Sequence, residues 1–346
     1  MNTVATPAPS GVPVRESVRG TARAPARTQV RGPAREPAQR ETLSVHDLVA
    51  ERDLTLADLN LVFRLAAEVK ASPRSFARAL EGKQLALIFE KPSLRTRVTF
   101  EVGIQSMGGH VVFLDHTQAR LGERESIADV ARNLERWVHG IVARVYEQRV
   151  LDEMAATTEI PVVNALSDRF HPCQALADYF TLEEKFGSLK GFKLAYVGDG
   201  NNVSHSLIYL AARLGVHLRI ATPANYAPDT DVIADSRRVA KETKAKIELF
   251  IDPREAVEDV QAVYTDSWTS MGFEAEEKIR SEVFKPYQVN RKLMALAERD
   301  AVFMHCLPAH RGYEVTREIL DGPQSVVLDQ SENRMYVQKA ILHTLF

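Results

Sequence analysis

The sequence predicts an α/β protein with two doubly wound parallel-sheet domains joined by inter-domain helices, together with a disordered N-terminal tail. Three observations predict this class. Short apolar runs alternate with stretches of helical period, the alternation occurs in two successive series, and one long helical stretch separates the series. Such alternation favours βαβ units, in which helices cover both faces of a parallel sheet. With 346 residues and 45% apolar content, the chain can fill two ordinary cores.

The first 41 residues are built mainly from Ala, Pro, Arg, Thr, Gly and Val, with an arginine at every fourth position from Arg15 to Arg35. Four-residue spacing would place these arginines along one side of a helix, but Pro25, Pro33 and Pro37 oppose a continuous helix. An Arg-rich, acid-poor N-terminus can also be a transit peptide. Because no apolar face accompanies the arginines, we predict a disordered, solvated tail over residues 1–41.

The first globular series begins near Leu43 and is expected to form a domain over residues 42–186. A first helix is indicated by apolar residues at helical spacing: Leu59, Phe63, Ala66 and Val69. Short apolar runs then predict four strands: Leu85–Phe89, His110–Leu114, Ile141–Tyr146 and Pro161–Leu166. A helix is expected between the second and third of these, over Ser126–Val138.

The second series is expected to form a domain over residues 187–330, after a connecting helix Pro172–Phe186 that ends at Gly187. Its apolar runs predict six strands: Lys193–Val197, His217–Ala221, Lys246–Ile251, Ala262–Thr265, Ala301–His305 and Ser325–Leu328. A last helix, from Glu332 to about Leu345, accounts for the C-terminal segment 331–346.

The turn after the first strand has the composition of an anion-binding loop. Glu90 to Arg97 lie between the strand and a stretch whose apolar residues share one helix face. The first N–H groups of a helix lack partners and carry the positive end of its dipole. Ser93 and Thr96 add hydroxyl donors, while Arg95 and Arg97 add guanidinium groups that match phosphate oxygens. The alternative is that Ser93 merely caps the helix and the arginines are solvated.

Further polar residues follow the other predicted strands. Ligands of open α/β sheets bind outside the carboxyl ends of the strands, so residues far apart in sequence are expected to meet in one cleft. The residues concerned are Gln118, Gly122, Arg144, His171, Gln174, Asn201, Asn202, Asp266 and Cys306.

Four motifs together resemble a known family. Ser93-Leu94-Arg95-Thr96-Arg97 is similar to the carbamoyl phosphate loop of the transcarbamoylases, and His171-Pro172-Cys173-Gln174 also occurs across that superfamily. The segment from Asp266 to Gly272, containing Ser-Met-Gly, and His305-Cys306-Leu307-Pro308 resemble its ornithine carbamoyltransferase branch. The resemblance extends from about Thr42 to the C-terminus.

The resemblance implies transfer of the carbamoyl group of carbamoyl phosphate to the side-chain amine of L-ornithine, giving L-citrulline and phosphate in arginine metabolism. It implies a carbamoyl phosphate-binding first domain, an ornithine-binding second domain, and a C-terminal helix that packs back on the first. It also implies a cytoplasmic homotrimer, or a multiple of trimers, that uses no cofactor and no metal. The sequence leaves arginine synthesis and arginine breakdown open.

The resemblance also assigns roles to residues. Arg144, His171 and Cys306 would be catalytic. Carbamoyl phosphate would be bound by Ser93, Leu94, Arg95, Thr96, Gln118, Arg144, His171, Gln174, Cys306, Leu307 and Arg334. Ornithine would be bound by Asn202, Asp266, Ser270 and Met271. The loop around Gln118 would lie at a subunit boundary and reach into the neighbouring subunit's site.

Three alternative functions on this fold stay open. Leu94 stands where the ornithine branch most often has Thr, and Ser-Leu-Arg-Thr is also seen in relatives that carbamoylate N-acetyl- or N-succinyl-ornithine. The Ser270-Met271-Gly272 turn favours free ornithine. Aspartate carbamoyltransferase would be expected to have His-Pro-Leu-Pro where His305 to Pro308 stand. A non-catalytic amino-acid-binding protein would be expected to lose Arg95, Arg144 or His171, and all three are present.

Other partners are disfavoured. Gly198-Asp199-Gly200 looks like the start of a dinucleotide fingerprint, but Val203 replaces its third glycine. His305, Cys306 and His310 could suggest a metal, although neighbouring strand residues point to opposite faces. A net charge of −2 gives no reason to expect nucleic acid or an anionic membrane, and no apolar run approaches about 18 residues. The two cysteines lie inside motifs, which favours a reducing compartment.

Overall fold

The structure is a computed structural model that describes residues 41–269 and 274–346. The predicted disordered tail therefore lies outside the described residues except for Glu41. The two predicted ornithine contacts Ser270 and Met271 lie outside them as well.

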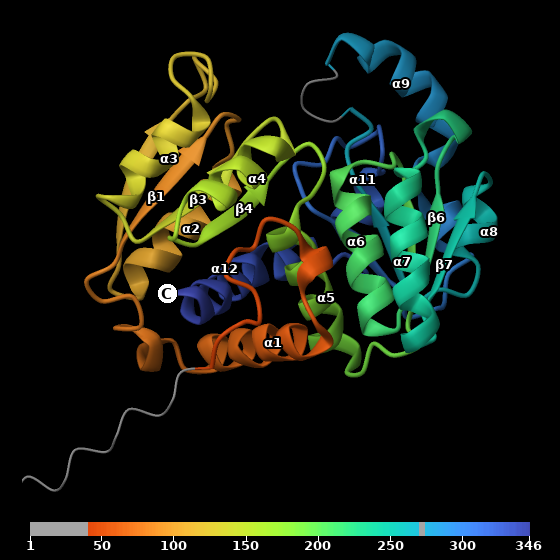
Figure 1. Cartoon of the computed structure of the whole chain (residues 1–346). Helices are drawn as coiled ribbons and strands as arrows, with labels where there is room; N and C mark the ends of the chain where they lie inside the picture. The colour runs from red at the N-terminus through yellow and green to blue at the C-terminus, as the bar shows by residue number, and fades with distance from the viewer. Residues whose placement is uncertain (1–40, 270–273) are drawn as a thin grey trace, which may run out of the picture. The chain divides into compact units, whose positions relative to one another are not determined.

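The first sheet is parallel, with strand order β2-β1-β3-β4. Its strands are β1 (Gln84–Phe89), β2 (His110–Asp115), β3 (Gly140–Arg144) and β4 (Val162–Leu166). Alternate β1 side chains enter different cores. Leu85, Leu87 and Phe89 pack with α2 (Leu94–Ser106), whereas Ala86 and Ile88 pack with α3 (Ile127–Glu135) and α4 (Gln148–Thr157). Helices thus cover both faces of this sheet (Figure 1).

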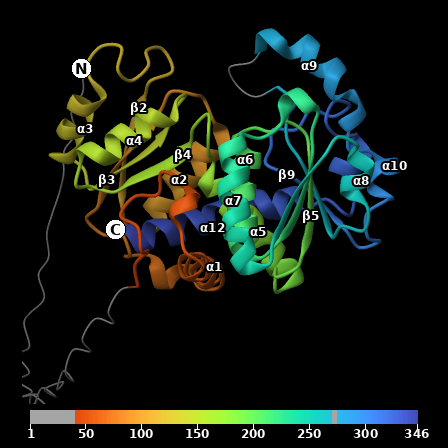
Figure 2. The same cartoon turned by 45° about the vertical axis from the view of Figure 1, so that its right-hand side comes forward.

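The second sheet is also parallel, with strand order β7-β6-β5-β8-β9. Its strands are β5 (Lys193–Val197), β6 (His217–Ala221), β7 (Lys246–Phe250), β8 (Ala262–Thr265) and β9 (Val302–His305). One face packs with α6 (Asn202–Leu214) and α7 (Thr230–Thr243). The other packs with α8 (Pro253–Val257), α9 (Glu277–Phe284), α10 (Arg291–Met294) and α11 (Arg317–Leu320). Figure 2 shows α6 and α7 at the left of this sheet and α8 and α10 at its right.

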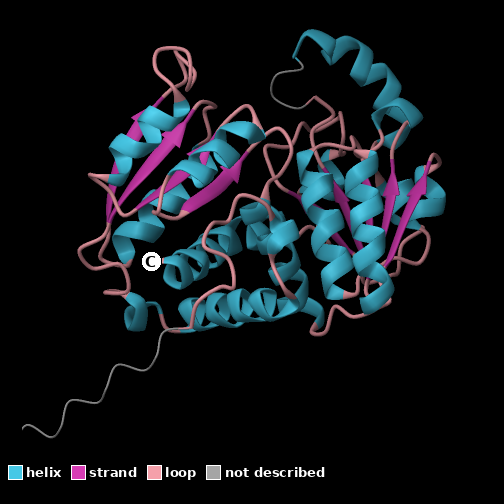
Figure 3. Ribbon diagram, viewed as in Figure 1, coloured by secondary structure: helices cyan, strands magenta, loops and turns pink. Residues whose placement is uncertain are grey.

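Three long helices connect the sheets. These are α1 (Leu56–Ala71), α5 (Pro172–Phe186) and α12 (Val327–Leu345), and α12 contacts α1, α5 and α2. A single apolar cluster includes residues of these helices and of both sheets, so the core is continuous between the sheets. The C-terminal helix therefore packs against α2, which begins with the Ser93–Arg97 motif, and in Figure 3 the long helices lie below the first sheet and to the left of the second.

Short 3₁₀ turns occupy several connections: η1 (Glu51–Asp53), η2 (Pro73–Phe76), η3 (Ala224–Tyr226), η4 (Glu274–Glu276) and η5 (Lys285–Tyr287). Within the described ranges, none of the helices combines the length and apolar character that a membrane crossing requires.

The predicted fold class is confirmed, and most predicted elements lie within two residues of the observed ones. The strand predicted over Ser325–Leu328 is wrong. Ser325 forms only an isolated bridge with Phe303, and α12 begins at Val327, five residues before the predicted start of the last helix. Leu328 is 76% exposed, so this apolar run is not a buried strand. The helix predicted over Ser126–Val138 is shorter, because Ser126 caps α3 and the helix ends at Glu135.

Candidate active site

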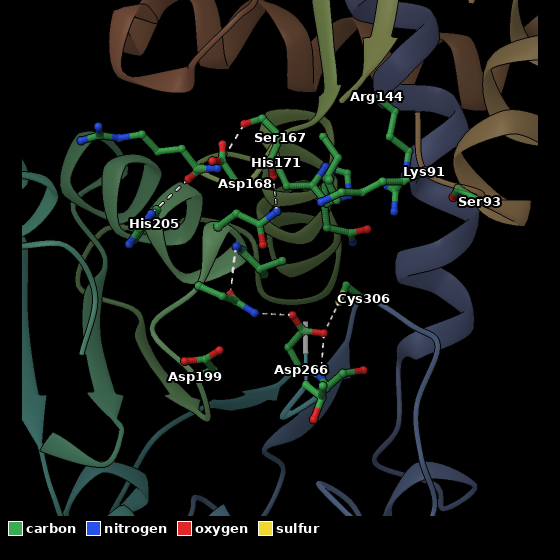
Figure 4. A pocket seen from close by; sticks show the side chains of 18 of the residues that line it. Lys91, Ser93, Arg144, Ser167, Asp168, His171, Asp199, His205, Asp266 and Cys306 are labelled. Carbon is green, nitrogen blue, oxygen red and sulfur yellow. Dashed lines mark hydrogen bonds between the residues drawn. The ribbon is translucent and has the colours of Figure 1, made fainter. Parts of the chain in front are cut away.

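A cavity of about 1110 Å³ is lined by loops that follow the carboxyl ends of strands in both sheets. Most predicted site residues lie around it (Figure 4). Those that line it are Ser93, Leu94, Arg95, Thr96, Arg144, His171, Gln174, Asn202, Asp266, Cys306, Leu307 and Arg334. Gln118 does not line the cavity and is exposed in the loop after β2.

The phosphate-loop motif forms the N-terminus of α2. Ser93 is the N-cap and accepts a hydrogen bond from the Thr96 N–H at 3.3 Å, while its own hydroxyl lies 3.0 Å from Thr96 Oγ1. The Leu94 side chain is 74% exposed and has no polar atom, so it adds no polar contact. Its N–H is nevertheless one of the first helical donors. The first turn therefore presents backbone and hydroxyl donors to the cavity.

The two arginines of the motif have different surroundings. Arg95 lines the cavity. Arg97 instead donates to Glu101 at 2.8 Å and lies 3.6 Å from the centre of the Phe113 ring. The expectation that both arginines contribute to one phosphate cradle is therefore wrong for Arg97. The two side chains project from different sides of α2, because residues two apart on a helix do not share a face.

Three arginines from three elements meet at the cavity. Arg144 ends β3, and burial lowers its pKa to about 9, with the Arg334 and Arg95 charges adding to the effect. Burial also lowers the pKa of Arg95 and of Arg334. Arg334, from α12, donates to Thr96 Oγ1 at 2.8 Å. This arrangement concentrates positive charge in a buried place, which is the environment that a dianionic ligand would stabilise.

Lys91 is a buried cation at this cavity that sequence reasoning missed. Its Nζ lies 4.4 Å from the centre of the Tyr146 ring. Burial lowers its pKa to about 8, and the Arg144 charge adds to the effect. The sequence offered one sign of this role, because Lys91 lies immediately before Pro92 and Ser93 in the stretch from Glu90 to Arg97.

His171 is the N-cap of α5 and is 4% exposed. Its N–H donates to Ser206 Oγ at 2.8 Å, which ties the start of α5 to α6. Burial, followed by the charges of Arg334 and Arg144, lowers its pKa well below the usual value. The imidazole is therefore neutral at neutral pH and can donate one ring hydrogen without adding another charge.

Asp266 follows β8 and is held by donors from three segments. Its Oδ1 accepts from Cys306 Sγ at 3.0 Å and from the Ser267 N–H at 2.7 Å, and its Oδ2 accepts from Asn201 Nδ2 at 2.8 Å. Burial and the neighbouring Asp266 carboxylate raise the pKa of Cys306 well above its usual value, so its thiol stays protonated. Figure 4 shows Asp266 and Cys306 facing each other on the side of the cavity opposite Arg144.

Family comparisons agree with this geometry. A model of the "Aspartate/ornithine carbamoyltransferase, carbamoyl-P binding domain" matches residues 46–184, and one of the "Asp/Orn binding domain" of the same enzymes matches residues 190–345. The chain belongs to the aspartate/ornithine carbamoyltransferase family. The anabolic ornithine carbamoyltransferase of Pyrococcus furiosus is 48% identical over 303 residues, which cover 88% of this chain and 95% of that protein.

Solved carbamoyltransferase structures are also similar. The ornithine carbamoyltransferase from P. furiosus has a TM-score of 0.83, covering 86% of this chain and 95% of that one at 48% identity. An N-acetyl-L-ornithine transcarbamylase mutant has a TM-score of 0.79 and 30% identity, covering 87% of this chain and 99% of that one. The family resemblance inferred from the four motifs is thereby confirmed.

In this carbamoyltransferase the two asparagines after β5 have different contacts. Asn202 donates from Nδ2 to the Ser167 carbonyl at 2.6 Å, which connects the loops after β5 and β4. Asn201 caps α6 through Oδ1 and reaches Asp266 through Nδ2. Sequence reasoning placed only Asn202 among the ornithine contacts, whereas Asn201 is the one bonded to the Asp266 carboxylate.

The glycines before these asparagines allow a close backbone approach. A Cβ on Gly200 would lie 2.2 Å from Pro228 N and 2.4 Å from the Ala227 carbonyl carbon. The side chain of Val203 is buried behind the turn. The glycine at 200 is therefore accounted for by packing against the loop at 226–228, and the dinucleotide interpretation is not needed to explain it.

His305 has both ring nitrogens engaged. Its Nδ1 accepts from the Leu307 N–H at 2.8 Å, and its Nε2 lies 3.2 Å from Glu314 Oε1. The expectation that the His305 and Cys306 side chains are too far apart to share a ligand is wrong. The possible ligand atoms of Asp266, His305 and Cys306 all lie within 4.8 Å of one another. The two contacts of the ring nevertheless leave it no free lone pair for a metal.

Proposed function

We propose that this chain is an ornithine carbamoyltransferase, which transfers the carbamoyl group of carbamoyl phosphate to the side-chain amine of L-ornithine and releases L-citrulline and phosphate. The observation that carries the proposal is one cavity whose first-sheet side gathers Arg95, Arg144 and Arg334 and whose second-sheet side presents Asp266 and Cys306. A relative named as an anabolic ornithine carbamoyltransferase, 48% identical over 88% of this chain, supports the same activity in arginine biosynthesis.

Carbamoyl phosphate would occupy the first-sheet side. The α2 N-terminus, with Ser93, the Leu94 N–H, Arg95 and Thr96, would bind the phosphate. Arg144 and the neutral His171 would donate to the carbonyl oxygen, where negative charge develops during attack. Each such preorganised donor typically contributes about 2.7–4 kcal/mol to transition-state stabilisation. Gln174 would contact the carbamoyl NH₂, and Arg334 completes the charge around the anion.

Ornithine would occupy the second-sheet side. Asp266 would hold the α-amino group, and Asn202 would hold the α-carboxylate. Cys306 and the Leu307 carbonyl would orient the side-chain amine. The neutral amine attacks the carbonyl carbon, the bond from that carbon to the phosphate oxygen breaks, and the amine proton leaves with the phosphate. Because the Cys306 thiol keeps its proton, we assign it an orienting role rather than that of a base.

The second candidate is transfer to N-acetyl- or N-succinyl-ornithine, which Leu94 keeps open. Those relatives also have leucine at the position of Leu94. The Leu94 side chain is exposed and has no polar atom, so it makes no polar contact at the cavity. The N-acetyl-L-ornithine transcarbamylase structure is 30% identical to this chain, against 48% for the ornithine enzyme. The test is product formation from carbamoyl phosphate with L-ornithine, the two acylated ornithines and L-aspartate in parallel. Citrulline from ornithine at the highest kcat/KM is expected, and a preference for an acylated acceptor would overturn the proposal.

We also propose a cytoplasmic homotrimer, or a multiple of trimers, with domains at residues 42–186 and 187–330. An apolar stripe on α2 supports self-association: Leu94, Val98 and Val102 recur every four residues and are 74%, 45% and 46% exposed. The loop with Gln118 is held at Leu121, whose N–H donates to buried Glu90 at 2.7 Å. Its exposed tip is thereby free to reach a neighbouring subunit. Native mass measurement tests this, with three chain masses, or a multiple of three, expected.

A further inference from the structure

The Gln174 side chain has its NH₂ group turned away from the cavity. Its Nε2 donates to Asp178 Oδ1 at 2.7 Å, one turn further along α5. Its Oε1 is buried and has no hydrogen-bond partner among the described residues. Gln174 lines the cavity and Asp178 does not. Because the NH₂ is bonded to Asp178, the oxygen is the polar atom of Gln174 that points away from Asp178 and is left for a ligand.

This orientation is set by a chain of hydrogen bonds whose direction begins at a backbone group. The His305 N–H in β9 can only donate, and it donates to Gln330 Oε1 at 3.0 Å. The Gln330 Nε2 must then point the other way, and it donates to Asp178 Oδ1 at 2.7 Å. Asp178 Oδ1 is therefore an acceptor, and the group that Gln174 presents to it must also be the NH₂.

The rest of the Asp178 carboxylate is also occupied. Tyr264, from β8, donates its hydroxyl to Oδ2 at 3.0 Å, and Asp178 is fully buried. The carboxylate thus receives three donors from β8, α5 and α12. This network resists rearrangement, because a flipped Gln174 amide would set its oxygen against the Asp178 carboxylate oxygen, and a flipped Gln330 amide would set its NH₂ against the His305 N–H.

We propose that Asp178 is a positioning residue that fixes Gln174 as a hydrogen-bond acceptor, so that the site selects an acyl phosphate carrying NH₂ over one carrying CH₃. The inference rests on the proposed carbamoyl phosphate site and deepens it. Carbamoyl phosphate and acetyl phosphate have the same phosphate, the same carbonyl and nearly the same size. Shape and charge therefore cannot separate them well, whereas an acceptor aimed at the NH₂ position can.

The test compares the two acyl phosphates in full-length variants. The readouts are kcat and KM for carbamoyl phosphate at saturating ornithine, and the Ki of acetyl phosphate as a competitive inhibitor. The variant is Asp178→Leu, because leucine places methyl groups where the carboxylate oxygens were. Freed from its acceptor, the Gln174 amide can turn its NH₂ to the cavity. We expect KM for carbamoyl phosphate to rise roughly 10- to 100-fold, and Ki for acetyl phosphate to change less than about 3-fold.

Two matched variants separate orientation from general stability. Asp178→Asn keeps an acceptor, since its oxygen can take the Oδ1 place, facing both glutamines, while its NH₂ donates to the Tyr264 oxygen. It should retain the wild-type selectivity. Tyr264→Phe removes one donor to Asp178 without touching Gln174, so it should lower the melting temperature and leave selectivity unchanged. Should Asp178→Leu fail to fold by circular dichroism, Asp178→Ala removes the same oxygens and carries the same expectation.

The outcomes are distinct. A folded Asp178→Leu enzyme with the wild-type ratio of KM to Ki would overturn the inference, as would equal weakening of both acyl phosphates. Loss of selectivity in Tyr264→Phe would assign the effect to packing and also overturn it. A wild-type protein that does not use carbamoyl phosphate at all would instead contradict the proposed function.

Discussion

At the scale of single residues, the cavity is marked by three arginines whose positive charges lie close together. Arg95, Arg144 and Arg334 are each buried enough to have a lowered pKa, and the charges of Arg334 and Arg95 add to that effect on Arg144. Within the described part of the chain, no carboxylate lies within ion-pair distance of Arg95 or Arg334. A bound dianion would offset this repulsion, so binding and stability should be linked.

The first prediction uses Arg95 and Arg97 as a matched pair. Arg95→Ala should weaken carbamoyl phosphate binding by roughly 30-fold or more, because losing one side of a buried charge-assisted contact costs about 2–5 kcal/mol. Arg97→Ala should change affinity little, since its guanidinium contacts Glu101 and Phe113. Calorimetric titration measures both, and a melting curve confirms the fold. Equal effects of the two substitutions would contradict the assignment of the phosphate to the Arg95 side of α2.

The second prediction concerns Glu51, in η1. Burial raises its pKa to about 7, while nearby Ser206 lowers it by less, and neither carboxylate oxygen has a hydrogen-bond partner in the described ranges. A carboxyl whose pKa is higher in the folded state contributes full stability below its unfolded value of 4.5 and loses it as the pH rises toward 7. Glu51→Gln should remove this loss, which is on the order of 3 kcal/mol.

The measurement is the unfolding midpoint at pH 5 and at pH 8 for wild type, Glu51→Gln and a control. The glutamine variant should gain most at pH 8. Asp53→Asn, an exposed change in the same turn, should show no such pH-dependent gain. If Glu51→Gln gains no more at pH 8 than at pH 5, the carboxyl is not the source of the pH dependence.

Residue roles were only partly predictable from sequence. Strand ends and motif spacing brought together twelve predicted residues around one cavity. The different roles of Arg95 and Arg97 could not be predicted, because the exact first residue of α2 decides which of the two side chains faces the cavity. Asp178 could not be found either, since its importance depends on Tyr264 and Gln330, which are 86 and 152 positions away.

At the scale of elements, the C-terminal helix shows where sequence patterns fail and where they succeed. Its start was predicted as a strand, because three apolar residues in a row, Val326 to Leu328, match a buried strand as well as a helix turn. Its end was predicted to return to the first domain. Phe346, after the last residue of α12, packs against Gly140 at the start of β3.

The third prediction tests that contact. A Cβ on Gly140 would lie 2.1 Å from Phe346 Cε1, so Gly140→Ala forces the ring to move and should destabilise the protein by about 1–3 kcal/mol. Phe346→Ala alone should also destabilise it through lost packing. The double variant should be less destabilised than the sum of the two by roughly 1 kcal/mol or more. Urea unfolding of the four proteins measures this coupling, and strict additivity would show that the ring does not pack on Gly140.

At the scale of the whole molecule, the α/β class and both parallel sheets followed from the alternation of apolar runs and helical stretches. Strand order and the division of helices between faces did not follow, because they depend on pairings such as β1 with both β2 and β3. The family resemblance implied only that the C-terminal helix packs back on the first domain, and the continuous core between the sheets was not predicted. Its physical basis is that α5 and α12 bury side chains against both sheets.

The last prediction concerns the proposed trimer. In a closed ring of identical subunits each protomer both gives and receives the same contact. Gln118 lies in an exposed loop outside its own cavity, while Arg95 lines that cavity, so a complete site would combine Arg95 of one chain with Gln118 of its neighbour. Gln118→Ala and Arg95→Ala chains should each be nearly inactive alone, for different reasons.

Mixing the two inactive chains distinguishes shared from self-contained sites. A site is intact when a chain with Arg95 receives its loop from a chain with Gln118, and random assembly of an equal mixture into trimers makes this true for about one quarter of sites. Refolding the two variants together should therefore recover about one quarter of wild-type activity, and refolding either alone should recover almost none. Native mass measurement confirms that hybrids have formed. Confirmed hybrids with no recovered activity would mean that each chain completes its own site, and the exposed loop would then need another explanation.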